Sequence, residues 1–429
     1  YFAGDMYCLA YQYDFAMGTL AIAAGTLMII RGENGYSCAA LGALAAAGVA
    51  AWIYQLAGGL GVTGMSNGTS WGLYITMFMF FVGLSAGGLI VASSASVFHV
   101  ADYKKVALPA VILSTVCICC AGMFVLIDLG GIQRVWRIIT GPNPLSPLFW
   151  DICVITLYLA INVVYLAFMT SKKPGAADKV AVVSRFALPV AILVHSVTAW
   201  IFGLEMAREG WYSAIMAPLF VVSAMDSGLA LLILSLMGLN KSGRFKTDKK
   251  LLSNLAGLLT VCIAVDAFLV GCEVLTMAYP GAAGAETLAI MATGATAPFF
   301  WFEIVIGLLI PFCILVFAKN RARMGLVAAA SVCVVAGVFF KRVWLLLTSF
   351  VELNVAGAPG VSLGTTAAQQ GGAGMWALAG SYAPTWVEIV VAIGVVSLGA
   401  LAFVMLAQKL LPGGAPKREA VNVAAGEAA

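Results

Sequence analysis

The chain has 429 residues, of which 62% are hydrophobic and only 10% are charged, and its mean hydropathy is +1.02. Soluble domains carry about 25% charged residues, so this composition excludes a sizeable soluble domain and predicts a polytopic membrane protein. The net charge of +4 reflects basic loops between apolar runs and does not indicate nucleic-acid binding. No basic segment precedes the first apolar run, so we expect no cleavable signal peptide.

Apolar runs long enough to cross a membrane follow one another along the whole chain. A membrane-spanning helix needs about 20 apolar residues, and each such run predicts a helix. The expected fold class is therefore all-α, with ten or eleven transmembrane helices. The eleven candidate runs are 12–30, 38–60, 71–98, 106–130, 147–171, 183–206, 211–238, 251–278, 296–318, 324–350 and 385–410.

Basic residues occur almost entirely in alternate connections between these runs. One set of connections holds 18 of the 23 lysines and arginines, and the other set holds only Arg134, Arg137 and Arg208. Because Lys and Arg stay on the cytoplasmic side, the pattern predicts an outer amino terminus and a cytoplasmic carboxyl terminus. The two remaining basic residues, Lys341 and Arg342, lie inside an apolar run.

A repeated pattern predicts two four-helix units of the same orientation. The third run begins at Trp71 and carries Gly88 at offset 17, and the seventh begins at Trp211 and carries Gly228 at the same offset. Both runs enter the membrane from outside, which favours a parallel duplication. The predicted divisions are 1–70, flanking helices; 71–206, first four-helix bundle; 211–350, second four-helix bundle; 351–411, outer loop and last helix; 412–429, disordered cytoplasmic tail.

Ionisable side chains gather within the outer half of the expected membrane region. Such groups are expensive to place in a bilayer and usually have a function. With about 1.5 Å of rise per residue, their depths can be compared between helices. The groups are Asp128, His195, Glu205, Arg208, Asp266, Glu273, Glu303, Lys341 and Arg342, with Asp226 near mid-depth.

Three interpretations of these groups remain open. A quinone site needs hydrogen-bond partners and a proton acceptor, which a histidine near a carboxylate supplies. A secondary transporter would use the same groups as an ion or substrate pathway. In an inert membrane anchor they would form structural ion pairs, for example Glu303 with Lys341.

Lys341 and Arg342 are adjacent, so their side chains point about 100° apart on a helix. We expect one to face the bundle interior and to pair with a carboxylate, Glu303 or Glu273. The other is expected to extend towards the outer surface, because an unpaired charge in lipid is costly.

The motif content predicts that this chain holds no redox centre. A membrane haem needs two axial ligands, but the chain has only His99 and His195, which are expected at different depths. The ten cysteines lack the spacing of zinc or iron–sulfur sites, so we expect no haem and no metal. No P-loop or dinucleotide fingerprint occurs. If the protein handles electrons, another subunit must carry them.

Several stretches resemble the NrfD/PsrC family, the cofactor-free membrane subunits of polysulfide-reductase-like complexes. The similarity covers roughly residues 40–410. The stretches are Trp71-Gly-Leu-Tyr-Ile with the glycine-rich segment 83–88, Asp128-Leu-Gly followed by Arg134, the segment 144–150, the segment from His195-Ser-Val-Thr-Ala-Trp200 to residue 224, and Pro384-Thr-Trp386-Val-Glu388.

The resemblance implies a quinone-reactive subunit of a respiratory oxidoreductase in the cytoplasmic (inner) membrane of a prokaryote. It implies menaquinone or a similar quinone bound near the outer face, and an iron–sulfur (ferredoxin-like) partner subunit docked there. A molybdopterin catalytic subunit or a multihaem cytochrome would complete the complex.

The resemblance also assigns roles to residues by motif. His195 and Asp128 would be the catalytic groups at the quinone, and Arg134, Glu205 and Arg208 would help to bind it. In the second bundle Asp266, Glu273 and Glu303 would move protons, and we extend this expectation to Asp226, Lys341 and Arg342.

Overall fold

The computed structural model describes residues 35–66, 68–97, 101–279, 282–351 and 382–411. Within these ranges the regular elements are helices and no strand occurs. Ten helices there are long and apolar enough to cross a membrane, which confirms an all-α, polytopic membrane protein. The predicted run 12–30, the predicted tail 412–429 and His99 lie outside the described residues.

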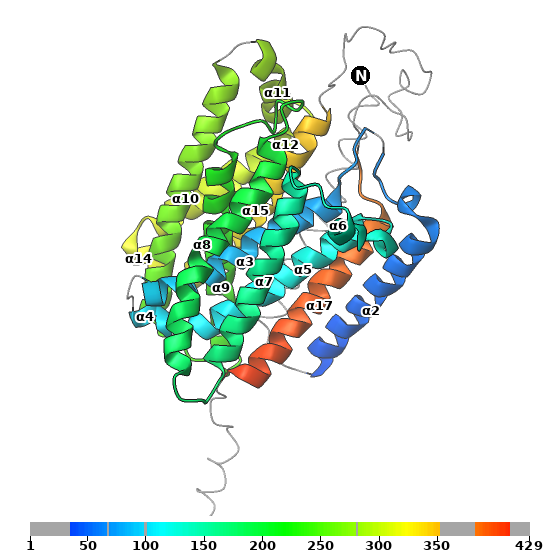
Figure 1. Cartoon of the computed structure of the whole chain (residues 1–429). Coiled ribbons are helices and arrows are strands. Elements are labelled where there is room, and N and C mark those ends of the chain that lie inside the picture. The colour runs from blue at the N-terminus through cyan, green and yellow to red at the C-terminus, as the bar shows by residue number, and fades with distance from the viewer. Residues whose placement is uncertain (1–34, 67, 98–100, 280–281, 352–381, 412–429) are drawn as a thin grey trace, which may run out of the picture.

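The ten spans agree with the predicted runs to within a few residues at most ends, and short helices lie in the connections (Figure 1). Pro147 stands in a first helical turn, where the missing N–H is tolerated. The spans are α2 (Gly35–Gly58), α3 (Leu73–Val97), α5 (Ala107–Asp128), α7 (Pro147–Met169), α8 (Ala176–Gly203), α9 (Met216–Lys241), α10 (Lys249–Ala278), the broken span α12 (Ala297–Phe302), η3 (Glu303–Leu309) and α13 (Ile310–Leu315), then α15 (Met324–Val351) and α17 (Trp386–Leu410). The short helices are η1 (Leu60–Val62), α4 (Ala101–Lys104), η2 (Ile132–Arg134), α6 (Arg137–Thr140), α11 (Ala282–Ala292) and α14 (Ala318–Arg321).

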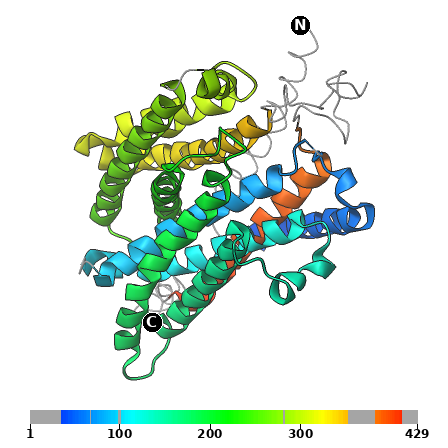
Figure 2. The same ribbon diagram turned by 45° about the horizontal axis from the view of Figure 1, so that its top comes forward.

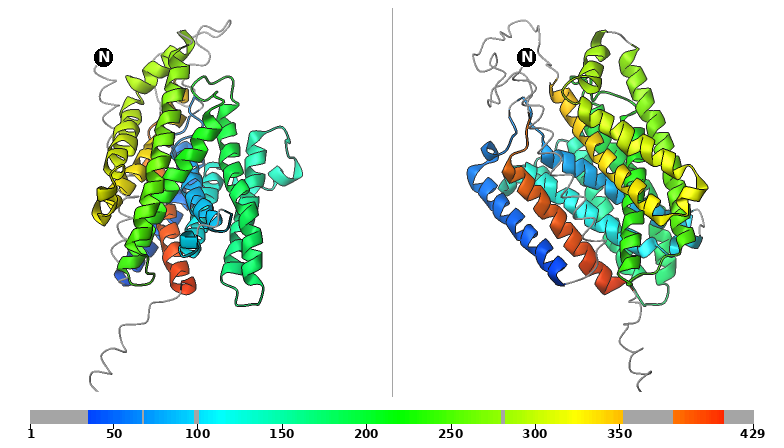
Figure 3. Two further views of the ribbon diagram at one scale, coloured as in Figure 1. Left: turned by 90° about the vertical axis from the view of Figure 1, so that its left-hand side faces the viewer. Right: turned by 180° about the vertical axis from the view of Figure 1, so that it is seen from behind.

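Two central helices, α3 and α9, hold the molecule together. Helices α5 and α8 pack on α3, with α7 against both, while α10 and α15 pack on α9 and close around α13. Figure 2 shows this second group, coloured green to yellow, as a layer of its own beside the first group. Helices α2 and α17 lie side by side at the far edge, and α17 packs on α5 (Figure 3). Because α9 also packs extensively on α3 and α8, the division into two bundles and the duplication both stay predictions.

Glycine permits the close crossing of α3 and α9. A Cβ atom built on Gly87 would lie 2.5 Å from the Cα atom of Gly228, which is closer than real contacts allow. Small residues let helix backbones approach in this way in membranes. Near the helix entries, the rings of Trp71 and Trp211 stack with their centroids 6.0 Å apart.

The run 296–318 predicted one regular helix for the ninth span, and this prediction was wrong. It passes from α12 into a π-helical turn, Glu303–Leu309, before α13. Pro311 lacks the N–H that a regular helix would need, and Gly307 packs so closely on Gly337 that neither has room for a side chain. The connection 279–295, expected as a loop, contains α11.

The two ends of the bundle carry different short elements. Helices α4 and α14 and the turn between α7 and α8 lie at one end, and α6 and α11 lie at the other (Figure 1). The first end carries the basic connections, so it is the predicted cytoplasmic end. We call it the inner end, and we call the end with α6 and α11 the outer end.

Candidate functional site

Three side chains in the second bundle form a buried charge cluster, which we call the Lys341 cluster. The Nζ atom of Lys341 on α15 lies 2.8 and 2.9 Å from the two carboxylate oxygens of Asp266 on α10. It lies 3.2 Å from Oε1 of Glu303 on η3. Trp344 donates a hydrogen bond of 2.5 Å to the other oxygen of Glu303. All these groups are buried, so the charges are removed from bulk solvent and depend on one another for compensation.

The expected pairing of Lys341 was partly right. Its interior position and its contact with Glu303 are confirmed. Asp266 takes the place expected for Glu273, which instead accepts a hydrogen bond of 2.8 Å from Ser213. Glu273 lies two helical turns further along α10 towards the outer end, and depth estimates from span limits could not separate the two.

Arg342 does not extend to the outer surface, and this prediction was wrong. The side chain is 1% exposed, because residues 337–350 are buried on every side of α15. Its Nη2 atom donates a hydrogen bond of 2.6 Å to Ser223 on α9, and its guanidinium lies 4.0 Å from the centre of the Phe220 ring. Both adjacent basic residues therefore face protein.

Unsatisfied polar atoms surround Arg342. Its Nε and Nη1 atoms are buried and make no hydrogen bond in the described part of the chain. The same holds for both carboxylate oxygens of Asp226, one turn along α9 from Ser223. Buried polar groups without partners are costly, so these atoms are available for hydrogen bonds to internal water.

His195 lies on α8, about 12 Å along the helix from its outer end. The side chain is 1% exposed, and its Nε2 atom makes no hydrogen bond to any described residue. An imidazole nitrogen buried without a partner is available to a ligand or to water.

Asp151 is a carboxylate next to this helix that was not among the predicted site residues. It lies on α7, is 4% exposed, and accepts a hydrogen bond of 2.6 Å from Thr198 on α8. Thr198 follows His195 by three residues, so the two side chains lie on the same face of α8. Asp151 thus stands one turn from His195, and its position after Pro147 and Trp150 was the available signal.

Asp128 ends α5 at the outer end of the first bundle. Its Oδ1 atom is buried and makes no hydrogen bond to a described residue, His195 included. Gln55 on α2 donates to the carbonyl of Ile127 at 3.2 Å and accepts from the hydroxyl of Tyr74 on α3 at 2.6 Å. These bonds fix the last turn of α5, where carbonyls have no partner within the helix.

A second carboxylate at the outer end, Glu388, is buried at the start of α17. Glu388 accepts hydrogen bonds from the hydroxyl of Tyr382 at 2.6 Å and from the backbone N–H groups of Gly64 and Thr385 at 2.7 and 2.9 Å. It completes a capping box with Thr385 at the start of α17. The Thr-x-x-Glu pattern before an apolar run was the signal for this role.

The three other residues assigned to the quinone lie elsewhere at the outer end. Arg134 and Glu205 are exposed. Arg208 donates to the backbone carbonyl of Ser349 on α15, and its guanidinium lies 4.9 Å from the centre of the Phe350 ring. Arg208 therefore ties the segment after α8 to α15, while Arg134 and Glu205 face the surface.

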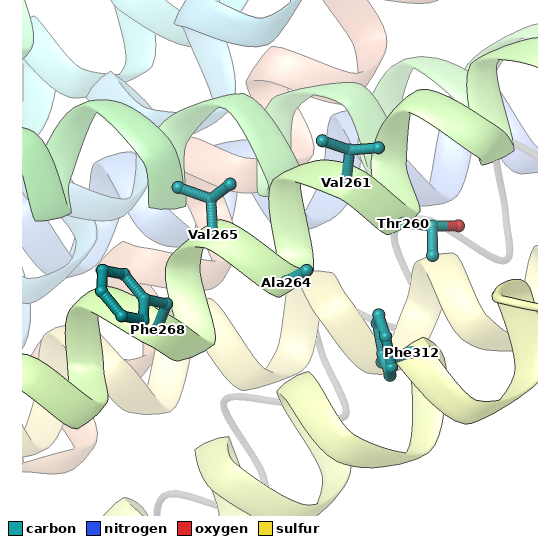
Figure 4. A pocket seen from close by; sticks show the side chains of 6 residues that line it. All are labelled: Thr260, Val261, Ala264, Val265, Phe268 and Phe312. Atoms are coloured by element: carbon teal, nitrogen blue, oxygen red, sulfur yellow. The ribbon is translucent and has the colours of Figure 1, made fainter.

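An apolar depression of about 320 Å³ lies on the outside of the second bundle between α10 and α13 (Figure 4). Its lining residues are Thr260, Val261, Ala264, Val265, Phe268 and Phe312. The Thr260 hydroxyl donates hydrogen bonds to backbone carbonyls, so the lining offers no free polar group to orient a quinone ring. The depression suits a lipid chain.

In the described part of the chain, ten helices long and apolar enough to span a membrane, with ionisable groups buried between them, define a multi-pass integral membrane protein. The profile of the polysulphide reductase NrfD family matches residues 61–354. The chain therefore belongs to this family, which confirms the resemblance.

Three relatives cover most of the chain. A Halobacterium salinarum protein described as a membrane subunit of a dimethyl sulfoxide reductase is 36% identical over 85% of this chain and 88% of its own length. An Archaeoglobus fulgidus protein described as the integral membrane subunit of an Hdr-like menaquinol oxidoreductase is 28% identical over 82% and 88%. An Escherichia coli protein described as a b-type cytochrome subunit of Ni/Fe-hydrogenase 2 is 26% identical over 84% and 88%.

Proposed function

We propose that this chain is the quinone-reactive membrane subunit of a respiratory oxidoreductase complex. His195 carries the proposal, because its buried Nε2 atom lies in the outer half of the first bundle without a hydrogen-bond partner in the described chain. Membership of the NrfD family and relatives described as membrane subunits of a dimethyl sulfoxide reductase and of a menaquinol oxidoreductase support it.

The donor set fits a quinone ring, for which we propose menaquinone. A bound quinol supplies two electrons and two protons. His195 can donate to or accept from one ring oxygen, and its buried site excludes bulk water. Asp128, whose Oδ1 atom also lacks a partner among the described residues, offers a carboxylate for the second proton. Arg134 and Glu205 are exposed, and we assign them to the edge of the site.

The electrons leave this chain for a partner. We propose an iron–sulfur, ferredoxin-like subunit on the outer end, followed by a molybdopterin catalytic subunit or a multihaem cytochrome. The site of assembly would be the cytoplasmic membrane of a prokaryote. We retain the prediction that this chain holds no haem or metal, and the name of the E. coli relative makes haem the first property to measure.

The second bundle is proposed to hold exchangeable protons. Lys341 and Arg342 carry two positive charges, and Asp226, Asp266 and Glu303 could carry three negative ones. A cluster buried this deeply favours zero net charge, which leaves one carboxyl group with a proton. Asp226, which has no hydrogen-bond partner among the described residues, is the proposed holder, and Glu273 is the proposed link towards the outer end.

Replacing His195 with leucine tests the proposal. His195→Leu keeps bulk while removing both ring nitrogens, and it should lower quinol-linked turnover of the complex at least about tenfold, since proton transfer by a positioned side chain contributes about 10²–10⁴-fold. Asp128→Asn should also slow turnover. The matched control is Ser196→Ala on the same helix, because the Ser196 hydroxyl bonds the backbone of Ile192.

Assembly distinguishes the quinone site from an inert anchor. His195→Leu and Asp128→Asn should still co-purify with the partner subunits. If both variants assemble and keep normal quinol kinetics, the quinone reacts elsewhere and the proposal fails.

A further inference from the structure

Helix α10 carries an outward-facing row of residues whose chemical character changes along the helix. Its members follow one another at steps of three or four residues, which place them on one face of a helix. The row consists of Lys250, Asn254, Gly257, Val261, Ala264 and Phe268. All are exposed except Gly257, which is partly exposed. The first two residues are polar and lie at the inner end, whereas the last three are apolar and line the depression between α10 and α13 (Figure 4).

The lengths of the polar and apolar parts match one leaflet of a membrane. From Gly257 to Phe268 the helix rises about 16 Å, which is close to half of the roughly 30 Å hydrocarbon thickness of a bilayer. From Gly257 back to Lys250 it rises about 10 Å, which is enough to cross a headgroup layer of roughly 5–8 Å. The row therefore places its polar part at the level of the inner headgroups and its apolar part at the level of the acyl chains.

Arg321 on α14 is held in place at the inner end of α13. Its Nη1 atom donates hydrogen bonds to the backbone carbonyls of Leu315 and Val316 at 2.9 and 3.3 Å. These carbonyls belong to the end of α13, where helix carbonyls lack a partner within the helix. Both bonds use one of the three guanidinium nitrogens. Because a guanidinium has five N–H donors, Arg321 retains the capacity to bind an anion.

Two contacts show that Arg321 adjoins the apolar depression. Thr260, which lines the depression, donates a hydrogen bond of 3.3 Å to the same Leu315 carbonyl that Arg321 binds. A Cβ atom built on Gly257 would lie 3.8 Å from Nε of Arg321. Because glycine has no side chain, the face of α10 stays open beside the guanidinium. A cationic group thus stands at the inner end of the depression.

The connections around Arg321 are strongly basic. Segments 241–250 and 319–323 together hold eight lysines and arginines and one acidic residue, Asp248. The two segments lie close together because α10 and α14 pack against each other. Clusters of four to eight basic residues at the cytoplasmic end of membrane helices attract anionic lipid headgroups. The charge of this surface therefore complements an anion at the inner end of the row.

We propose that this surface binds one anionic phospholipid of the inner leaflet. Arg321 and Lys250 bind its phosphate, and one acyl chain fills the depression between α10 and α13. The depression has a volume of about 320 Å³, at the lower end of the roughly 300–1,000 Å³ of pockets that enclose a whole small ligand. This size suits a single chain. The proposal is independent of the quinone assignment, because it uses no residue of the first bundle and none of the Lys341 cluster.

Two other occupants fit the surface less well. A quinone carries no charge for Arg321 and Lys250 to bind, and its ring would meet no free polar group in the lining, because the Thr260 hydroxyl already donates to backbone carbonyls. An apolar helix of a partner subunit would likewise leave the basic surface without an anion. A phospholipid is the occupant that combines an apolar chain with a phosphate at the required distance along α10.

The test uses the purified complex in detergent and a photoactivatable phosphatidylglycerol whose diazirine lies in the middle of one acyl chain. After illumination, mass spectrometry of peptides locates the label. We expect label on α10 between Val261 and Phe268 and on α13 at Phe312. An excess of unlabelled phosphatidylglycerol should remove this label. The same excess of phosphatidylcholine, whose headgroup has no net charge, should not.

Two variants alter the two halves of the site. Arg321→Gln removes the charge that binds the phosphate, and Lys250→Gln takes its place if that variant does not assemble. The apparent affinity for phosphatidylglycerol, measured by native mass spectrometry, should fall at least about tenfold, as expected for a lost hydrogen bond to a charged group. Ala264→Phe fills the depression from an exposed position and should also weaken binding, because the acyl chain loses its place.

The matched controls make the same changes elsewhere. Lys409→Gln removes an exposed positive charge at the inner end of α17, and Ala160→Phe adds a ring at an exposed position in the middle of α7. Both should bind phosphatidylglycerol with the affinity of the wild type.

Three results would overturn the proposal. Label spread evenly over the exposed faces of the spans, or removed equally well by phosphatidylcholine, would show that the depression meets only bulk lipid. Wild-type affinity in both the charge variant and Ala264→Phe would place the bound lipid elsewhere. Label missing from α10 and α13 in the complex would show that another occupant, such as a partner helix, covers the depression.

Discussion

Replacement of Lys341 with methionine is the perturbation whose energetic result the structure defines best. Met fills most of the volume but leaves Asp266 and Glu303 buried without their shared cation, which lies 2.8 Å from one and 3.2 Å from the other. Breaking a buried ion pair by removing one partner costs about 3–5 kcal/mol. We therefore expect Lys341→Met to lower the yield and the melting temperature of the complex.

Neutralising the carboxylates separates a structural role from a proton role. In the variant Lys341→Met with Asp266→Asn and Glu303→Gln, no charge of the Lys341 cluster remains buried, so yield and melting temperature should recover towards wild type. Trp344 can still donate to the amide oxygen of residue 303. Turnover should stay low, because none of the three groups can then exchange a proton.

Thermal melting of the purified complex and quinol-linked turnover are the two measurements. Recovery of both stability and full turnover in the charge-free triple variant would show that the cluster only holds helices together. An unchanged melting temperature in Lys341→Met alone would contradict the buried ion pair itself. The matched control is Lys319→Met. Lys319 lies on the short inner helix α14 with its side chain exposed, so its replacement leaves no buried carboxylate without a partner.

Three further results are expected. A single cysteine placed at position 365 should react with an impermeant label from outside and one at position 245 should not; the reverse pattern would invert the topology. A pyridine haemochrome assay on the isolated subunit should be blank, and a stoichiometric b-type signal would overturn the absence of haem. Gly228→Ala should lower the melting temperature, because Gly87 backbone atoms lie where its Cβ would stand, while Gly122→Ala, which has open space, should not.

The spans could be predicted from the sequence because their cause is local. A run of about 20 apolar residues has only the helix as a way to satisfy its backbone in lipid. The runs 106–130 and 385–410 therefore correspond closely to α5 (Ala107–Asp128) and α17 (Trp386–Leu410). The family could also be predicted from the stretches that resemble it, and its profile matches residues 61–354.

Side-chain partners depend on how helices pack, and these could be predicted only in part. Lys341 was expected to contact Glu303, and it does. Its second partner, Asp266, could not be predicted without knowing which face of α10 is turned towards α15. One of the two adjacent basic residues was expected at the surface because their side chains point about 100° apart, whereas α15 is covered on all sides near Arg342. The π-helical turn at Glu303 also arises from packing, at Gly307 on Gly337.

The buried polar face of α7 shows a signal that was present in the sequence and was not used. Asp151, Tyr158, Asn162 and Tyr165 recur at helical spacing within an apolar run, which places them on one face. Attention to ionisable groups alone passes over neutral hydroxyl and amide groups. Which face of α7 is buried could not be known before α3, α5 and α8 were seen to cover it.

The most direct test of the quinone assignment is an experimental structure of the purified complex with its lipids and quinone retained. The account predicts a quinone ring at the outer end of the first bundle, with one ring oxygen within hydrogen-bond distance of Nε2 of His195. A ring bound elsewhere, for example in the apolar depression between α10 and α13, with His195 bonded to another group, would contradict it.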